Sequence, residues 1–142
     1  MYSLTDYVMN YWLLKTEPET FSWDDLSRDK KAGWDGVRNF QARTHLKNMK
    51  KGDEAFVYHT GDEKAVIGIA KVTKEQYPDP TDNAWVAVEI APVRKLKKPV
   101  SLAQIKSDKE LSDMVLVRAS RLSVQPVKKE EFDYVIALSE NV

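Results

Sequence analysis

Hydrophobic and polar positions along the chain switch repeatedly between the spacing typical of strands and the spacing typical of helices. Runs of aromatic and branched residues, some alternating with polar neighbours, predict strands. Apolar positions three and four residues apart, together with Ser or Asn residues that can cap a helix start, predict helices. The predicted strands are residues 11–15, 54–60, 65–72, 85–93 and 121–125, and the predicted helices are residues 22–28, 39–51, 101–105 and 128–138.

The predicted elements follow one another without a regular alternation of strands and helices. This order favours an α+β fold over a doubly wound parallel sheet. Because short strands can hardly cover a core as an open sheet, we expect a small curled β-barrel of about five or more strands with flanking helices. Residues 31–36 and 77–83 are expected to be loops, and Gly68 within a predicted strand indicates a bulge or a close approach of another segment.

The length and composition are those of one globular domain. The chain has 142 residues, of which 42% are hydrophobic and 31% are charged. We expect a single domain over residues 1–142, with residues 1–10 as a loosely ordered extension. No apolar run is long enough to cross a bilayer, and residues 1–10 do not resemble a secretory signal. We therefore expect no membrane partner and a cytoplasmic location, or a nuclear one if the chain is eukaryotic.

The charge balance and the absence of cysteine exclude several kinds of site. The 22 Lys and Arg residues balance the 22 Asp and Glu residues, which argues against a protein that holds nucleic acid by bulk charge. The strongest basic run, at residues 94–98, is interpreted first as a solvated face. His45 and His59 are too few for a catalytic zinc site, and the known glycine-rich nucleotide motifs are absent. We expect no metal, no cofactor and no catalytic residue.

The most informative segment is Trp-Asp-Gly-Val-Arg-Asn-Phe-Gln-Ala-Arg at residues 34–43. Trp34 stands on a glycine-flanked loop before a predicted helix, whose free N–H groups favour anions. Trp34 suits stacking on a flat ligand, and Arg38 suits a phosphate. Asn39 or Gln41 can read a polar edge. A purely structural interpretation competes with this one, in which Trp34 caps the core, Arg38 pairs with an acid and Asn39 caps the helix.

A second polar group, Lys15, Thr16 and Glu17, ends the first predicted strand. An amine, a hydroxyl and a carboxylate at adjacent positions suit either acid–base chemistry or a hydrogen-bonding rim. The ordinary interpretation is a salt-bridged strand end.

Two further groups occupy later predicted strands. In the second strand, alternation puts Tyr58 and Thr60 on one face and His59 on the other, where the three can line the mouth of a pocket. In the last strand, Arg121 and Ser123 share a polar face. A buried structural histidine and a solvated edge strand are the competing interpretations.

In combination, these segments resemble the EVE domain family of the PUA-like superfamily. The most specific signal is WDGVRN followed by QAR. The matching strings, in the family's order and from residue 11 onward, are YWLLKTEPETFSWDDL, WDGVRNFQAR, AFVYH, RLSVQPV and EEFDYVIAL. The resemblance implies a curled β-barrel with flanking helices. It also implies a non-enzymatic pocket that holds a flipped, modified base, chiefly 5-methylcytosine or an oxidised form in DNA.

Carried over position by position, the resemblance implies a single base pocket. Glu17 or the Asn39 carbonyl would accept a hydrogen bond from the amino group of a cytosine, and Val37 would contact its methyl group. Trp34 or Tyr58 would stack on the ring and offset the cost of flipping. The His59 or Thr60 side chain would donate to the ring edge. Phosphate would be met by Arg38 and Arg121, together with Lys15. The implied pocket residues are Lys15, Thr16, Glu17, Trp34, Val37, Arg38, Asn39, Gln41, Tyr58, His59, Thr60, Arg121 and Ser123.

Two other functions stay open from the sequence. Small PUA-like relatives include ASCH-type amidohydrolases with Lys, Thr and Glu on a pocket wall, so Lys15, Thr16 and Glu17 also fit a nucleoside amidohydrolase, although alternation would turn Thr16 away. The other alternative is a module for modified RNA. The loop at residues 77–83 is shorter than in longer family members, which weighs against a grip on long duplex DNA. DNA with a modified base is the expected partner of a monomer, with an unidentified effector protein acting after binding.

Overall fold

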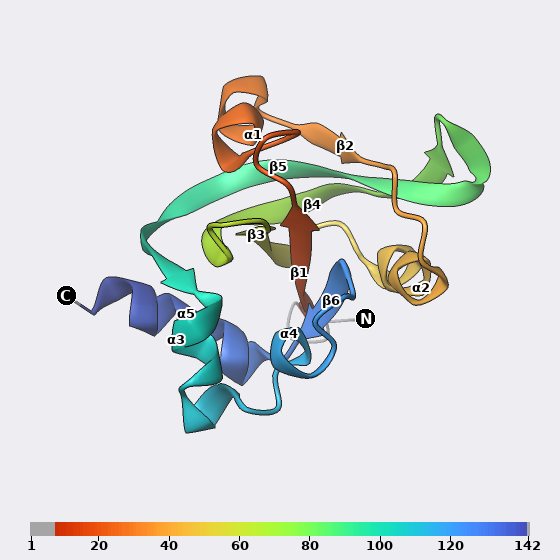
Figure 1. The fold of residues 1–142 in the computed structure, drawn as a ribbon. Coiled ribbons are helices and arrows are strands. Elements are labelled where there is room, and N and C mark those ends of the chain that lie inside the picture. Colours follow the sequence, from red (N-terminus) through yellow and green to blue (C-terminus); the bar gives the residue numbers. More distant parts are fainter. Residues whose placement is uncertain (1–7, 142) are drawn as a thin grey trace, which may run out of the picture.

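Six strands form one mixed sheet in the order β2-β5-β4-β3-β1-β6 (Figure 1). The structure, a computed structural model, describes residues 8–141, so most of the extension expected at residues 1–10 lies outside the described residues. The strands are β1 Tyr11–Thr16, β2 Ala32–Trp34, β3 Glu54–His59, β4 Ala65–Asp79, β5 Asp82–Ser101 and β6 Val124–Val127. The helices are α1 Trp23–Asp29, α2 Phe40–Asn48, α3 Leu102–Lys106, the 3-10 helix η2 Lys109–Leu111, α4 Val115–Arg118 and α5 Lys129–Glu140.

The sheet mixes parallel and antiparallel pairs and is open at both ends. β1 runs parallel to β3 and antiparallel to β6, and the helices are not interleaved as regular crossovers, which confirms the predicted α+β class. β2 and β6 stand at opposite ends of the strand order, so the described strands do not close into the expected barrel. An open sheet suffices because β4 and β5 are 15 and 20 residues long and curve across the molecule (Figure 1).

The sheet buries apolar side chains on both faces. Trp12 and Leu14 of β1 join one core cluster while Leu13 joins the other, as strand alternation requires. The first core includes the buried faces of α1 and α2. The second core includes α5, whose Phe132 stacks on Phe56 of β3 with ring centroids 4.0 Å apart. β1 therefore packs against a core on each of its faces, and this packing fixes the position of its C-terminal end.

Gly68 of β4 fulfils both expectations for a glycine inside a strand. The pairing of β3 with β4 shifts register between Val57 and Tyr58, opposite Gly68. A Cβ at Gly68 would also lie 2.6 Å from the ring of Trp23, so only glycine lets α1 pack this closely on the sheet.

Several boundaries differ from the predictions. The loop expected at residues 31–36 contains β2, which pairs with β5. The loop expected at residues 77–83 is the tip of the β4–β5 hairpin, with a turn at Pro80 and Thr81. The strand expected at residues 121–125 begins only at Val124, so Arg121 and Ser123 lie on the turn that precedes β6 and not on one strand face.

Candidate functional site

A cleft of about 800 Å³ opens where the end of β1 meets the segment that joins β2 to α2. Its wall combines apolar side chains of the first core with polar side chains from three separate parts of the chain. The lining residues are Lys15, Thr16, Glu17, Thr20, Phe21, Ala32, Gly33, Trp34, Asp35, Gly36, Val37, Arg38, Asn39 and Ser123.

One wall is the tight turn between β1 and α1. The Glu17 carbonyl accepts hydrogen bonds from the N–H groups of Thr20 and Phe21, each at 2.9 Å. The Thr16 hydroxyl donates to the Phe21 carbonyl at 2.6 Å, so this hydroxyl is used in shaping the turn. α1 then begins with a capping box in which Ser22 and Asp25 satisfy each other's backbone N–H groups. The turn leaves the exposed Glu17 carboxylate on the rim of the cleft.

The floor is apolar and belongs to the first core. Trp34 is 8% exposed and meets Phe21 edge to face, with ring centroids 6.1 Å apart. Val37 is buried to the same extent. Trp34 thus packs as a core residue and offers the cleft only a small part of its ring.

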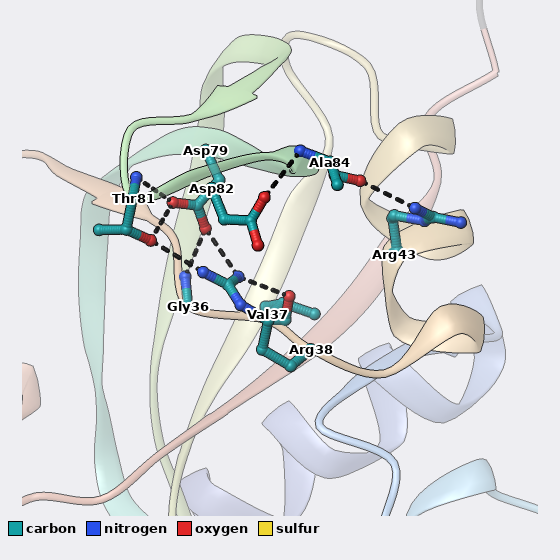
Figure 2. A network of polar contacts seen from close by, with 8 residues as sticks. All are labelled: Gly36, Val37, Arg38, Arg43, Asp79, Thr81, Asp82 and Ala84. Atoms are coloured by element: carbon teal, nitrogen blue, oxygen red, sulfur yellow. Dashed lines mark hydrogen bonds and ion pairs between the residues drawn. The ribbon is translucent and has the colours of Figure 1, made fainter.

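Asp79 anchors the opposite wall from the tip of the β4–β5 hairpin. One carboxylate oxygen accepts from the Gly36 N–H at 2.8 Å and from Arg38 at 3.0 Å, while the other accepts from the Thr81 N–H at 2.7 Å and its hydroxyl at 2.6 Å (Figure 2). Arg38 also donates to the Thr81 hydroxyl at 2.8 Å. The hairpin tip therefore holds the cleft-lining loop in place.

The protonation of Asp79 reflects these contacts. The side chain is completely buried, which by itself raises the pKa of the carboxyl. The hydrogen bonds donated by Thr81, Gly36 and Arg38 outweigh burial and hold the pKa of Asp79 well below its usual range. Asp79 is consequently an anion, and it neutralises the charge of Arg38.

Asn39 stands where the cleft meets a smaller hollow of about 360 Å³. Its side-chain oxygen accepts from the Ala42 N–H at 2.9 Å and caps α2. Its amino group has no partner among the described residues. The cap thus fixes the amide so that Asn39 offers a ligand a donor, whereas the sequence interpretation used its carbonyl as an acceptor.

Lys15 closes the cleft on the side of β6. Its amine donates to the Ser120 carbonyl at 2.5 Å and lies 5.8 Å from the centre of the Tyr58 ring. The Lys15 N–H donates to the Ser123 carbonyl at 3.0 Å, which joins β1 to the turn before β6. Burial lowers the pKa of Lys15.

The structure brings together most of the predicted site residues. Lys15, Thr16, Glu17, Trp34, Val37, Arg38, Asn39 and Ser123 line the cleft. Gln41 and Arg121 line the adjoining hollow with Asn39, Ala119, Ser120 and Leu122.

Tyr58, His59 and Thr60 line neither hollow. Tyr58 is buried in the second core. His59 accepts a hydrogen bond from the Trp23 N–H at 3.0 Å through Nε2, so its Nδ1 carries the proton that bonds Glu63 at 2.7 Å. Thr60 bonds the Thr16 carbonyl through its N–H at 2.9 Å. The structure thus gives these residues contacts that hold β3 to its neighbours.

Sequence reasoning missed several parts of the cleft. Phe21 and Thr20 line it because the turn after β1 folds back, and the signal available for this was the Pro18 that stops the strand. Asp79 was missed because its partners Gly36 and Arg38 are more than 40 positions earlier in the chain. No local pattern marks such a contact.

The part of the chain that the structure describes has neither a cluster of metal-binding side chains nor a helix long and apolar enough to cross a membrane. Residues 8–141 contain no group of three or more His, Asp or Glu residues placed to hold a metal ion. Within the same residues, no helix has both the length and the apolar character needed to span a membrane.

The fold and the cleft together define a PUA-like α+β domain with a ligand-sized hollow beside a helix start. The EVE domain family matches residues 10–138, and the chain belongs to this family. Thymocyte nuclear protein 1 from Homo sapiens is 39% identical over 92% of this chain and 74% of its own length.

Solved structures agree with this assignment. A protein from Rhodopseudomonas palustris is 44% identical, with a TM-score of 0.88 over 92% of this chain and 93% of its own. The human THYN1 protein, solved in complex with DNA that contains 5-methylcytosine, is 36% identical, with a TM-score of 0.88 over 94% of this chain and 99% of its own. An ASCH protein from Zymomonas mobilis is 15% identical with a TM-score of 0.56 over 90% of this chain and 94% of its own, a likeness of fold alone.

Proposed function

We propose that this protein is a non-enzymatic reader of a modified base in DNA, 5-methylcytosine or an oxidised form of it. The base would be flipped out of the stack and held in the cleft between β1 and the β2–α2 segment. The observation that carries this proposal is the cleft itself, in a chain whose human relative was solved with DNA containing 5-methylcytosine. Flipping costs a few kcal/mol, so the cleft must return that amount through specific contacts.

The size and lining of the cleft support this proposal. A volume of about 800 Å³ lies within the usual range for sites that enclose a small ligand. A cytosine offers an amino donor and ring acceptors. The Asn39 amino group is free to donate to a ring acceptor, and the Glu17 carboxylate is free to accept from the amino group. Val37, one of the apolar side chains of the lining, would contact the methyl group.

The contacts of the polar residues favour a reader over an amidohydrolase. The Lys15 amine already donates to the Ser120 carbonyl, and the Thr16 hydroxyl already donates to the Phe21 carbonyl. Of the three candidate groups only the Glu17 carboxylate is without a contact among the described residues, whereas an amidohydrolase needs several groups that act together on the substrate. In this cleft the Lys15 and Thr16 contacts hold the wall in shape.

Binding of matched oligonucleotides tests the proposed function. The oligonucleotides carry one central cytosine, 5-methylcytosine or 5-hydroxymethylcytosine, each as DNA and as RNA of the same sequence. We expect a modified DNA to bind at least about tenfold more tightly than the unmodified one, a difference of about 1.4 kcal/mol. Equal affinity for all DNA forms would contradict a modified-base reader, and a preference for RNA would replace DNA as the target.

Substitution of Asn39 tests the direction of its hydrogen bond. Asn39→Asp keeps the oxygen that caps α2 but replaces the amino donor by an oxygen that repels ring acceptors. We expect this variant to bind the modified oligonucleotide about tenfold or more weakly, with thermal stability unchanged. Asn39→Ala is the matched control for the cap and should lower the unfolding free energy by about 1 kcal/mol. Wild-type affinity in Asn39→Asp would show that the amino group does not touch the base.

A further inference from the structure

An aromatic and cationic ladder stands on the surface beside the cleft. Phe40, the first residue of α2, stacks on Trp85 of β5 with ring centroids 5.2 Å apart and planes 28° from parallel. The guanidinium of Arg43, one turn along α2, lies 4.9 Å from the centre of the Phe40 ring and 5.0 Å from that of Trp85. Arg38 lies over the Trp85 ring at 5.6 Å. The stacked rings of Phe40 and Trp85 thus make cation–π contacts with two arginines.

The ladder is fixed in place by the hairpin tip. Arg43 donates to the Ala84 carbonyl at 2.9 Å, and Arg38 is held by Asp79 and Thr81, as Figure 2 shows for both arginines. The two guanidinium groups therefore cannot swing away from the rings without breaking these hydrogen bonds. The ladder is a preformed surface and not a chance encounter of mobile side chains.

Phe40 contributes little to the core. Its side chain is 68% exposed, whereas every other phenylalanine of the described residues is buried or half-buried. Single exposed apolar residues are ordinary on protein surfaces. Phe40 differs from the ordinary case because its ring is backed by a second ring and flanked by guanidinium groups, so its open part is presented in a fixed orientation.

The position of the ladder indicates its occupant. Phe40 follows Asn39, which lines both the cleft and the smaller hollow, and Arg38 belongs to the cleft wall and to the ladder. A base held in the cleft leaves its strand neighbours next to this rim. A nucleotide combines a flat base with a phosphate, which suits an exposed ring with the cation of Arg43 at its edge. An aliphatic or anionic protein segment would use only one of these two properties.

We propose that Phe40, backed by Trp85 and Arg43, stacks against the nucleotide that neighbours the base held in the cleft. This inference rests on the proposed function and adds a second contact outside the base pocket. We call Phe40, Trp85 and Arg43 the platform. The platform stacks on the neighbouring nucleotide in place of the base that was flipped out, and it does not contact the modification. Its contribution to affinity is consequently independent of the methyl group.

Three substitutions at Phe40 test the platform. Phe40→Ala removes the ring, Phe40→Leu keeps an apolar side chain without a ring, and Phe40→Tyr keeps the ring. The probes are a single-stranded DNA oligonucleotide with one 5-methylcytosine, its unmodified counterpart, and 5-methyldeoxycytidine monophosphate as a ligand that reaches only the cleft. Because stacking on an aromatic side chain is worth about 1–3 kcal/mol per base, Phe40→Ala and Phe40→Leu should bind both oligonucleotides about 5- to 150-fold more weakly.

The other readouts separate this inference from the proposed function. The ratio of affinities for the modified and unmodified oligonucleotides should be the same in all variants, the mononucleotide should bind all of them equally, and Phe40→Tyr should behave as wild type. The proposal that Phe40 stacks on a neighbouring nucleotide is overturned if Phe40→Ala binds the oligonucleotides as tightly as wild type. It is also overturned if the affinity for the mononucleotide falls by the same factor. A wild-type protein without preference for the modified oligonucleotide overturns the proposed function while the Phe40 variants still test the platform. A wild-type protein that binds no oligonucleotide overturns both.

Discussion

Asp79 joins the tip of the β4–β5 hairpin to the loop that lines the cleft. Its carboxylate accepts four hydrogen bonds from two segments that are far apart in the sequence. A buried carboxylate is expensive unless its oxygens are satisfied, and here each oxygen has two donors. The cost of burial is thereby offset, and the hairpin tip and the loop before α2 are joined at one point.

Asp79→Asn should destabilise the protein because the neutral amide holds Arg38 and the backbone N–H groups more weakly. We expect a loss of about 2–3 kcal/mol in unfolding free energy at neutral pH, the usual value for hydrogen bonds to a charged group. The matched control is Asp82→Asn, an exposed neighbour on the same hairpin, which should change stability by less than about 0.5 kcal/mol. Chemical denaturation of the two variants measures the difference, and equal stability of both would contradict the role given to Asp79.

The same carboxylate makes stability depend on pH. Because the folded state holds the pKa of Asp79 below its ordinary value of 3.8, the contribution of Asp79 is fully present above that value. It decreases as the pH falls below 3.8, since the unfolded chain then takes up the proton first. Wild type should therefore lose more stability than Asp79→Asn on acidification from pH 5 toward and below 3.8, and parallel curves would argue against this linkage.

At the scale of elements, α1 and β4 fit together only because residue 68 is glycine. Gly68→Ala would place a Cβ 2.6 Å from the Trp23 ring, which cannot yield without moving α1. We expect a loss of about 1–3 kcal/mol in unfolding free energy, as for other overpacked cores. Trp23→Leu makes room, so the double variant should be more stable than the sum of the two single changes predicts. Additive effects would mean that the clash is relieved elsewhere.

Elements with a strong local signal could be predicted from the sequence. The apolar run of residues 11–15 predicts β1, Ser22 and the acids after it predict α1, and helical spacing predicts α2 and α5. β2 was missed because its three residues surround a glycine and owe their strand conformation to pairing with β5. The outer parts of β4 and β5 were missed because Pro78 and Pro80 resemble loop residues.

The residues of the candidate site can be predicted from the sequence only where several of them lie within one short segment of the chain. Arg38 and Asn39 were identified from one short segment, and their structural contacts, an acid and a helix cap, were recognised as alternatives. Which acid pairs with Arg38 depends on the hairpin, which no local pattern reveals. Whether Tyr58 faces a cleft or a core depends on which helix covers β3, and α5 decides that only once the whole domain has folded.

At the scale of the whole molecule, the net charge is zero, and the cleft likewise is lined by both acidic and basic residues. Lys15 and Arg38 line it together with Glu17 and Asp35, and Arg38 is already paired with Asp79. Arg121 adds one exposed cation at the adjoining hollow. Few cations are thus available to replace the counterions of a DNA strand.

Binding of DNA should accordingly depend only weakly on salt. With about three phosphate contacts or fewer, the slope of log affinity against log salt should lie between 0 and about −3. Titrations between about 50 and 200 mM salt measure this slope. Lys97→Ala with Lys98→Ala serves as a control, because these exposed residues of the basic run line neither hollow, and it should leave the slope unchanged. A slope steeper than about −5 without base preference would indicate a charge-driven binder instead.

The second core, built around Phe56, Phe132 and Val135, shares no residue with the lining of the cleft. Substitutions there should alter chiefly how firmly the domain folds, and they reach the cleft only through contacts such as that of Tyr58 with Lys15. The choice of ligand therefore depends directly on residues on the cleft side of the sheet. Residues of the second core influence it only indirectly, through the stability of the fold and through such contacts. We therefore expect sequence differences around α5 to affect ligand choice little, whereas a change of ligand should leave its mark around β1, β2 and the start of α2.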